Sequence, residues 1–329
     1  MFCNALEMKM KDFLFRHSAA SGIPAPFEVP RIAAIGVFDG VHSGHQEIIR
    51  SAATVAENRS AIPLALSFSP HPRQLLTPGE PPQLLLPENE RIKRLCRAGA
   101  KECAFINFTH AVASLEPEEF LQALAENTLF RIAGICVGEH WKFGRNGSGD
   151  GKILHEFCAK HNWIYRGIPE LCVDGEIVSS TALRRAAVAG DLEKFRRFCG
   201  SEVTLYGKVV HGFAIAGSEL DAPTANLECD TAVPVPDGVY AGSTIVDGTI
   251  FPAAVNIGFA PTFGGSARRV EIHLIGFSGT LYGKTLAVKL HRFIRPERKF
   301  ATPAELKTQI AADITEIFRI EKQSSGGNG

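Results

Sequence analysis

Two histidines, His42 and His45, lie three residues apart in the glycine-rich segment GVFDGVHSGH, residues 36–45. The segment follows an apolar run of strand length and precedes a stretch with helical periodicity. Glycines allow a backbone to approach a ligand closely, and the first turn of a helix presents unpaired N–H groups that attract an anion. The histidines supply further donors to a phosphate that leaves with negative charge. Ser43 and Gln46 have the spacing of a capping box that would start the helix.

A second anion-binding pattern supports the first, because HxGH alone is a weak signal that a pair of turn-lining histidines would also produce. This second pattern is VSSTALRR, residues 178–185. Ser180 or Thr181 can cap a helix. Arg184 lies four residues after Ser180 and three after Thr181, so the hydroxyls and the guanidinium share one face of that helix. A capped helix with solvated arginines is the alternative interpretation. Two anion sites on one α/β sheet together favour a polyphosphate ligand.

A different pattern occurs in the second half of the chain, where residues 223–226 are PTAN and Glu271 lies in a strand-like run. Thr224 and Asn226 are two residues apart, so their oxygens point the same way from an extended segment, which suits a hard cation such as Mg²⁺ with phosphate. Glu271 is a candidate base for a substrate hydroxyl that attacks a phosphorus atom. An ordinary turn and an outward-facing strand carboxylate are the alternatives.

The elements that must position the first two motifs alternate between apolar runs of strand length and amphipathic helical stretches. The predicted strands are residues 32–38, 64–68, 104–108 and 132–137, and the predicted helices are residues 46–57, 88–97, 117–128 and 152–161. This βαβ order predicts a parallel, Rossmann-like α/β sheet that is covered on both faces and binds ligands beyond the carboxyl ends of its strands.

The pattern changes after about residue 197, where short strand-like runs are separated by Gly, Pro and Asp. These runs are residues 203–210, 239–246, 251–257, 270–277 and 285–293. They favour an antiparallel barrel or sandwich, against which a last amphipathic helix, residues 303–318, would pack. The expected organisation is a leader without a clear pattern (1–30), a first domain (31–190), a connector (191–202), a second domain (203–322) and a disordered tail (323–329).

The composition is that of an ordinary two-domain globular protein. Among 329 residues, 45% are hydrophobic, and 35 Lys and Arg balance 35 Asp and Glu. A formal charge of zero gives no reason to expect nucleic acid or an anionic membrane as a partner, and no segment predicts a secretory signal or a membrane span. The eight cysteines include no CxxC pair and no metal-ligand spacing, which argues against zinc and predicts the reducing cytoplasm.

The motifs taken together resemble those of the bacterial bifunctional riboflavin kinase/FMN adenylyltransferases, also called FAD synthetases. The N-terminal motifs, in the family's order, are GVFDGVHSGH (36–45), FSPHPR (68–73), VGEHWKFG (137–144) and VSSTALR (178–184). The C-terminal motifs are GKVVHG (207–212), PTAN (223–226), DGVY (237–240), NIG (256–258), PTF (261–263), EIH (271–273), LYGK (281–284) and RPE (295–297). The resemblance extends over nearly all of residues 31–320.

The resemblance implies two reactions with Mg²⁺ as the cofactor of both. An antiparallel β-barrel with a terminal helix would phosphorylate riboflavin to FMN with ATP, and the N-terminal nucleotidylyltransferase domain would adenylylate FMN to FAD with release of pyrophosphate. The implied catalytic residues are His42, His45 and Glu271, and the implied ATP- and phosphate-binding residues are Gly36, Phe38, Asp39, Gly40, Gly44, Ser180, Thr181 and Arg184. The implied flavin- or substrate-binding residues are Pro70, His71, Arg73, Arg295 and Glu297, and the implied metal ligands are Thr224 and Asn226.

Three segments depart from the family's usual residues. His140 and Trp141 replace an acidic or amide residue and a Phe, residues 213–222 carry two carboxylates in place of a Gly- and Arg-rich run, and Ala260 replaces an Arg. Repulsion between those carboxylates and ATP would weaken the kinase unless a cation screens it. Two alternatives are therefore an FMN adenylyltransferase with a degenerate flavin-binding C-terminal domain and a non-catalytic flavin or nucleotide sensor. The expected partners are riboflavin, FMN and ATP, with self-association left open.

Overall fold

The computed structural model forms two compact units, each described by itself below. It describes residues 14–19, 22–77, 79, 82–210, 225–231, 235–262, 265–298 and 300–325. The first unit comprises Met1–Pro82 and Glu88–Ser180, and the second comprises Gln83–Pro87 and Thr181–Gly329. Within the described part of the chain, no helix is both long and apolar enough to cross a bilayer.

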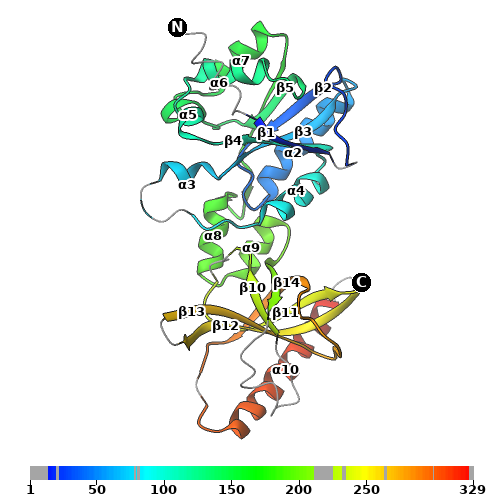
Figure 1. The fold of residues 1–329 in the computed structure, drawn as a ribbon, viewed down its shortest axis with the longest axis vertical. Coiled ribbons are helices and arrows are strands. Elements are labelled where there is room, and N and C mark those ends of the chain that lie inside the picture. Colours follow the sequence, from blue (N-terminus) through cyan, green and yellow to red (C-terminus); the bar gives the residue numbers. More distant parts are fainter. Residues whose placement is uncertain are drawn as a thin grey trace. The chain divides into compact units, whose positions relative to one another are not determined.

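The first unit contains a six-stranded sheet in the order β1-β4-β3-β2-β5-β6 (Figure 1). Its strands are β1 (Leu14–Ala19), β2 (Pro30–Ile35), β3 (Ile62–Ser69), β4 (Glu102–Asn107), β5 (Arg131–Gly138) and β6 (Ile164–Ile168). Strands β2 to β6 are parallel, which confirms the predicted α/β sheet, and β1 pairs antiparallel with β4. The expectation of a leader without pattern is therefore wrong for residues 14–19, which add an edge strand.

Helices connect the parallel strands as the sequence periodicity predicts. They are α2 (Ser43–Glu57), α3 (Pro72–Leu76), α4 (Glu88–Arg97), α5 (His110–Ala113), α6 (Pro117–Ala125) and α7 (Gly151–Lys160), with a 3₁₀ turn at Arg145–Gly147 and a small hairpin of β7 (Cys172–Val173) and β8 (Glu176–Ile177). Helix α4 has acidic residues in its first turn and arginines in its last, which complements the helix dipole. It buries Arg91 and Leu95, which are four residues apart on one face.

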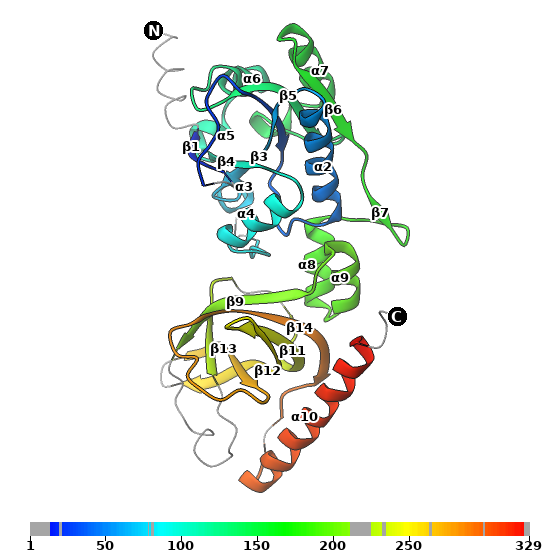
Figure 2. The same ribbon diagram turned by 90° about the vertical axis from the view of Figure 1, so that its right-hand side faces the viewer.

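The second unit is built on a closed barrel in the order β10-β13-β12-β11-β14-β9 (Figure 2). Its strands are β9 (Val203–Val210), β10 (Ala225–Cys229), β11 (Gly238–Val246), β12 (Thr249–Thr262), β13 (Gly265–Leu274) and β14 (Thr285–Arg295), and its helices are α8 (Ser180–Val188), α9 (Leu192–Cys199) and α10 (Pro303–Ser325). Every neighbouring pair of barrel strands is antiparallel. The barrel alternative is thus confirmed over the sandwich.

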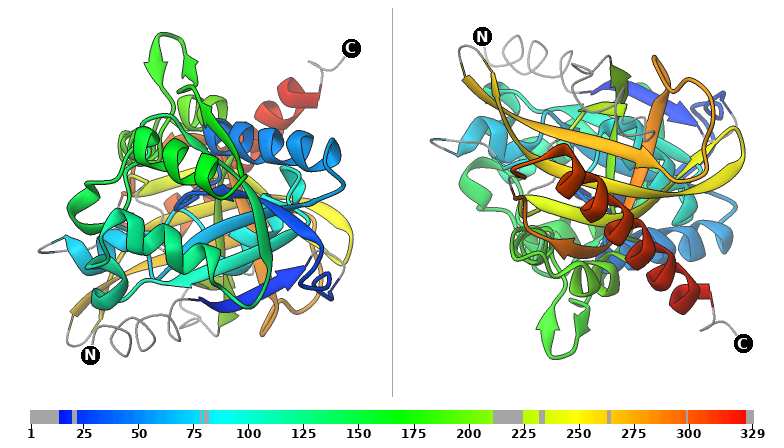
Figure 3. Two further views of the ribbon diagram at one scale, coloured as in Figure 1. Left: turned by 90° about the horizontal axis from the view of Figure 1, so that it is seen from above. Right: turned by 90° about the horizontal axis from the view of Figure 1, so that it is seen from below.

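Helix α10 lies across the barrel strands (Figure 3) and contacts β11, β12 and β14. It buries Ile317 and Ile320 beside Ala241 of β11. Because α10 continues to Ser325, the predicted disorder from residue 323 is wrong for residues 323–325. The last four residues of that predicted tail lie outside the described residues.

A buried ion pair joins Arg31 of β2 to Glu102 of β4 and holds the segment before β2. Arg31 is 0% exposed and Glu102 is 2% exposed, and Arg31 Nε donates to Glu102 Oε2 over 3.0 Å. The remaining guanidinium donors bind backbone carbonyls of Ala25, Pro26 and Val29. The pair therefore anchors residues 25–29 to the sheet.

We expect the variant Glu102→Ala to lower the free energy of unfolding by about 3–5 kcal/mol, because it leaves a buried guanidinium without its counter-ion. Both tryptophans, Trp141 and Trp163, lie in the first unit, so denaturant unfolding followed by their fluorescence measures this effect. Glu47→Ala is the matched control, since the Glu47–Arg50 pair is about half exposed and should contribute under about 1 kcal/mol. Equal losses in the two variants would contradict this account.

Candidate active sites

The first candidate site begins at the carboxyl end of β2, which lies between β3 and β5 where the connections of the sheet diverge. The turn after β2 is tightly folded: Phe38 and Val41 have φ values of 54° and 45°, and Gly40 has a φ of 84°. A Cβ on Gly36 would lie 2.9 Å from Phe38 Cε1, so glycine is needed for the Phe38 ring to fold inward. Left-handed backbone at non-glycine residues is costly and is found preferentially at functional sites.

The two histidines of this turn form one stacked pair at the start of α2. Their ring centroids are 3.6 Å apart with an angle of 20° between the planes, and the Phe38 ring meets His45 edge-on at 5.2 Å. His42 is the N-cap residue, and its Nδ1 accepts the backbone N–H of His45 over 3.3 Å. The predicted Ser43–Gln46 capping box is therefore wrong, since Gln46 Nε2 instead donates to the Val41 carbonyl over 3.0 Å.

Burial keeps both rings neutral in the free protein. It lowers the pKa of His42 to about 4, and burial together with the neighbouring His42 lowers the pKa of His45 well below its ordinary value. With Nδ1 of His42 accepting a hydrogen bond, the ring proton lies on Nε2. His45 Nδ1 is buried, and no hydrogen-bond partner reaches it within the described part of the protein. A buried polar atom without a partner is expected where a ligand completes the site.

The lowered pKa values predict a pH dependence of stability. The unfolded histidines take up protons below about pH 6.5, whereas the folded ones resist protonation, so stability is complete above that pH and falls as the pH drops towards 4. We expect the urea midpoint, followed by tryptophan fluorescence, to fall between pH 6.5 and 4.5. The double variant His42→Gln/His45→Gln should show a smaller fall over this range. An equal fall would assign the pH dependence to other groups.

Residues 178–180 meet this turn although they are far along the chain. Ser180 Oγ donates to the Asp39 carbonyl over 2.7 Å, so the hydroxyl that the sequence predicts as a helix cap bonds the turn after β2. A Cβ on Gly44 would lie 3.3 Å from His42 Nδ1 and 3.8 Å from the Val178 carbonyl. Thr181 and Arg184 belong to the second unit, where Arg184 Nε donates to the Gln83 carbonyl over 2.9 Å.

The loop after β3 carries the predicted substrate residues Pro70, His71 and Arg73. His71 caps α3: its Nδ1 accepts the Arg73 backbone N–H over 3.1 Å, and the Gln74 side chain accepts the His71 N–H over 3.2 Å. The His71 ring is buried by this role, whereas the Arg73 side chain is exposed. The His71 ring therefore serves as the N-cap of α3, whereas the Arg73 side chain remains accessible.

Arg91 is a site residue that the sequence analysis missed. Although only 5% exposed, its guanidinium donates to the Val37 carbonyl over 3.3 Å and to the Phe68 carbonyl over 3.4 Å. It also lies 4.9 Å from the centroid of the Phe105 ring. Arg91 thus connects the carboxyl ends of β2 and β3, from which both loops of the site begin. An arginine at an apolar position of the α4 periodicity is the signal that would have indicated it.

The VGEHWKFG segment, residues 137–144, is held within the first unit by its aromatic residues. Trp141 stacks on Phe143 with centroids 4.9 Å apart, and both contact Phe120. His140 is exposed, 3.5 Å from the Glu139 carboxylate. The indole of Trp141 therefore packs in an aromatic cluster with Phe120 and Phe143.

The second candidate site is a row of side chains across the barrel. Strand register pairs Asn226 with Glu271, Glu271 with Asn256, Asn256 with Val239, and Val239 with Arg295. Residues in direct register share one face of a sheet. A cavity of about 190 Å³ opens on this face and is lined by Val239, Ala254, Asn256, Glu271, His273, Arg295, Glu297, Arg298, Phe300, Leu306, Ile310 and Asp313.

The structure thus brings together four of the predicted residues of the second half. Glu271, Arg295 and Glu297 line the cavity. Asn226 lies on β10, in register with Glu271 of β13. Strand β10 itself was not predicted from the sequence. Thr224, the 213–222 segment and the Ala260 side chain lie outside the described residues.

Two contacts shape the wall of this cavity. Arg295 binds Asp313 of α10 through Nε at 3.1 Å and Nη2 at 2.8 Å, so part of the predicted flavin-binding guanidinium holds the terminal helix. A Cβ on Gly258 would come within 2.1 Å of the Glu297 carboxylate. Glycine at 258 is therefore required for Glu297 to approach β12.

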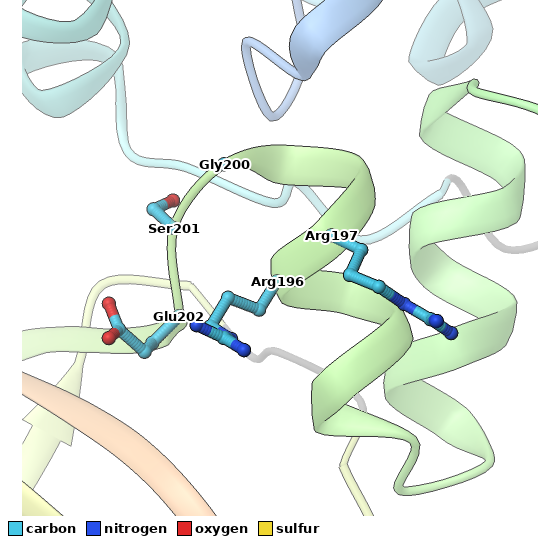
Figure 4. Close-up of a pocket in the computed structure, with 5 residues that line it drawn as sticks. All are labelled: Arg196, Arg197, Gly200, Ser201 and Glu202. Carbon is cyan, nitrogen blue, oxygen red and sulfur yellow. The ribbon is translucent and has the colours of Figure 1, made fainter. Parts of the chain in front are cut away.

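Another hollow, of about 300 Å³, lies at the end of α9 and is lined by Arg196, Arg197, Gly200, Ser201 and Glu202. Arg196 extends towards the backbone of Glu202, whose carboxylate points away from it, and Arg197 points to the opposite side (Figure 4). Burial raises the pKa of Glu202, but a hydrogen bond to its own backbone and the charges of Lys289, His291 and Arg196 outweigh burial and hold that pKa below its ordinary value. The opposite charges inside this hollow compensate one another, and none of the sequence motifs reaches it.

A parallel sheet with a stacked histidine pair at a helix start and a closed barrel with a carboxylate-lined cavity fit a two-domain enzyme of phosphate-group transfer. The family model described as FAD synthetase matches residues 26–182, and the one described as riboflavin kinase matches residues 199–320. The chain belongs to the family of bifunctional riboflavin kinase/FMN adenylyltransferases, as its relatives also show.

The relatives are similar over most of their length. The bifunctional riboflavin kinase/FMN adenylyltransferase of Escherichia coli K12 is 30% identical over 88% of this chain and 94% of that protein. The Pseudomonas fluorescens protein of the same name is 32% identical over 86% and 90%. A crystal structure described as a macrolide-efflux protein from Streptococcus pneumoniae is 27% identical with a TM-score of 0.78, covering 91% of this chain and 96% of that one. That description differs from the names of the sequence relatives, so we take from it the fold alone.

Proposed function

We propose that the chain makes FAD from riboflavin in two ATP-dependent steps. Residues 203–322 phosphorylate riboflavin to FMN, and residues 31–190 adenylylate FMN to FAD with release of pyrophosphate. The observation that carries the proposal is the presence in one chain of both sites: the stacked pair His42–His45 at the start of α2, and Glu271 beside Asn226 in the barrel.

Adenylyl transfer at the first site needs positioning more than a protein nucleophile. A phosphate oxygen of FMN attacks the α-phosphorus of ATP, and pyrophosphate leaves. The backbone N–H groups at the start of α2 and the ring N–H groups of His42 and His45 donate to phosphate oxygens. Ser180 holds the turn through Asp39, and Thr181 and Arg184 bind the departing phosphates. Among the loop residues, Pro70, His71 and Arg73 form the flavin side of this site.

Phosphoryl transfer at the second site needs a base and a metal-bound nucleotide. Glu271 accepts the proton of the ribityl 5′-hydroxyl as that oxygen attacks the γ-phosphorus of ATP. The amide oxygen of Asn226, beside Glu271, is a hard uncharged ligand of the kind Mg²⁺ accepts, and Thr224 would join it. Mg²⁺ held there would neutralise phosphate charge.

The match to the riboflavin kinase family over residues 199–320 supports this function against a degenerate barrel or a sensor. A binding module has no need of a carboxylate placed beside a metal-type amide ligand. The seven cysteines that the structure describes are thiols rather than disulfides, which supports a reducing compartment, the cytoplasm.

A product time course tests the function. Purified protein is incubated with riboflavin, ATP and Mg²⁺, and riboflavin, FMN and FAD are separated by chromatography; a parallel reaction starts from FMN. We expect FMN to appear first and FAD to follow. FAD formed only from supplied FMN would select the degenerate barrel, and neither product would exclude both activities.

Arg91 gives a prediction for the first reaction. The variant Arg91→Met keeps an unbranched side chain but removes both donors to the ends of β2 and β3, so we expect kcat/KM for FMN adenylylation to fall about tenfold to a hundredfold. Riboflavin phosphorylation should be unchanged, since the barrel lies in the other unit. Arg97→Met, on the exposed end of α4, is the control and should retain adenylylation. A similar loss in both variants would contradict a specific role for Arg91.

A further inference from the structure

Asn256 is a polar residue of the barrel cavity to which the proposed reaction gives no role. It lies on β12, in register with Glu271 of β13 on one side and Val239 of β11 on the other. Because residues in direct register share a face, its carboxamide lies on the same cavity wall as the candidate base. Any substrate that reaches Glu271 therefore passes close to Asn256.

The orientation of this carboxamide follows from its neighbour Glu297. Asn256 Nδ2 lies 3.5 Å from Glu297 Oε1 and donates to it. The flipped amide would place its oxygen against a carboxylate oxygen, and two acceptors repel each other. Glu297 in turn approaches this closely only because residue 258 is glycine. The side-chain oxygen of Asn256 is thus directed away from Glu297.

That oxygen, Oδ1, is buried, and no donor reaches it within the described residues. An acceptor buried without a donor is costly, and the cost is removed when a ligand supplies the donor. Phosphate oxygens do not suit this position at neutral pH, because they are acceptors and would also face the carboxylates of Glu271 and Glu297. A hydroxyl group suits it, since it donates to Oδ1 without adding charge.

We propose that Asn256 Oδ1 accepts a hydrogen bond from a ribityl hydroxyl of riboflavin and so positions the chain whose terminal hydroxyl Glu271 deprotonates. The inference rests on the proposed riboflavin kinase function. Glu297 acts through Asn256 by fixing the amide. Asn256 is a positioning and specificity residue, which selects flavins that carry a polyhydroxylated side chain.

Two dead-end inhibitors of the kinase reaction test this assignment. Lumiflavin has the flavin ring without the ribityl chain, and 5′-deoxyriboflavin keeps the chain but lacks the hydroxyl that is phosphorylated. We expect 5′-deoxyriboflavin to inhibit the unaltered protein with a Ki at least about tenfold below that of lumiflavin. In the variant Asn256→Leu, the Ki of 5′-deoxyriboflavin should rise about tenfold and that of lumiflavin should stay within about twofold.

The other outcomes overturn the proposal in distinguishable ways. Equal weakening of both inhibitors would place the contact on the flavin ring, and a rise in KM for MgATP alone would make Asn256 a metal or nucleotide ligand. Equal Ki values in the unaltered protein would overturn it without any variant. Retained inhibition by lumiflavin checks that the barrel of Asn256→Leu is folded, since the barrel is the unit that carries the substitution. An unaltered protein that does not phosphorylate riboflavin at all would instead be a failure of the proposed function.

Discussion

The variant His45→Ala is expected to reduce FAD formation from FMN and ATP by about 10²- to 10⁴-fold while riboflavin is still converted to FMN. The ring stacks on His42 at 3.6 Å, and its Nδ1 is a buried polar atom that no described residue satisfies. Its loss removes a donor to the phosphates and also the stacking partner that orients His42. Both effects act on the transition state, in which charge develops on the departing pyrophosphate.

Product analysis from supplied FMN measures this loss, and the urea midpoint followed by the fluorescence of Trp141 and Trp163, which lie in the same unit as His45, is the control for folding. His110→Ala is the matched variant, because His110 is exposed at the start of α5, and it should leave both reactions unchanged. Because both rings are neutral in the free protein, kcat/KM for ATP should show no ionisation of these histidines between pH 6 and 8. A residual rate within tenfold of the unaltered protein would exclude a central role for His45.

The variant Glu271→Gln is expected to have the opposite effect, with FMN formation reduced by about 10²- to 10⁴-fold and FAD formation from supplied FMN retained. Glutamine keeps the size of the side chain and its place between Asn226 and Asn256, but its amide cannot accept the hydroxyl proton. The loss should appear in kcat rather than in the KM for riboflavin, because substrate contacts other than proton transfer remain.

Glu228→Gln is the control for this variant, since Glu228 is exposed on β10 and lies in register with Lys208. It should leave riboflavin phosphorylation unchanged. Kinase activity of Glu271→Gln within twofold of the unaltered protein would exclude the base assignment. Loss of adenylylation from supplied FMN would show that the two sites do not act separately.

Local sequence patterns predicted the elements whose cause is local. Helix α4 and strand β9 have the predicted bounds, residues 88–97 and 203–210, because an amphipathic period and an apolar run are properties of a single segment. The glycine-rich turn with its two histidines was also recognisable, since the turn chemistry and the motif lie within ten residues. The same patterns did not decide between a barrel and a sandwich, because both bury alternating strands.

Contacts between distant segments were decided only by the tertiary structure. The edge strand β1 exists because it pairs with β4, and β10 is held by pairing with both β9 and β13, although neither segment has a strong pattern of its own. Arg91 and Asn256 look like an ordinary helix charge and an ordinary strand amide until the fold buries Arg91 and the side-chain oxygen of Asn256. Their roles depend on which carbonyl, carboxylate or empty space lies opposite. The periodicity of a sequence does not show which group will lie opposite a given side chain. The packed structure does, because it brings the two groups within contact distance and because buried polar atoms must be satisfied.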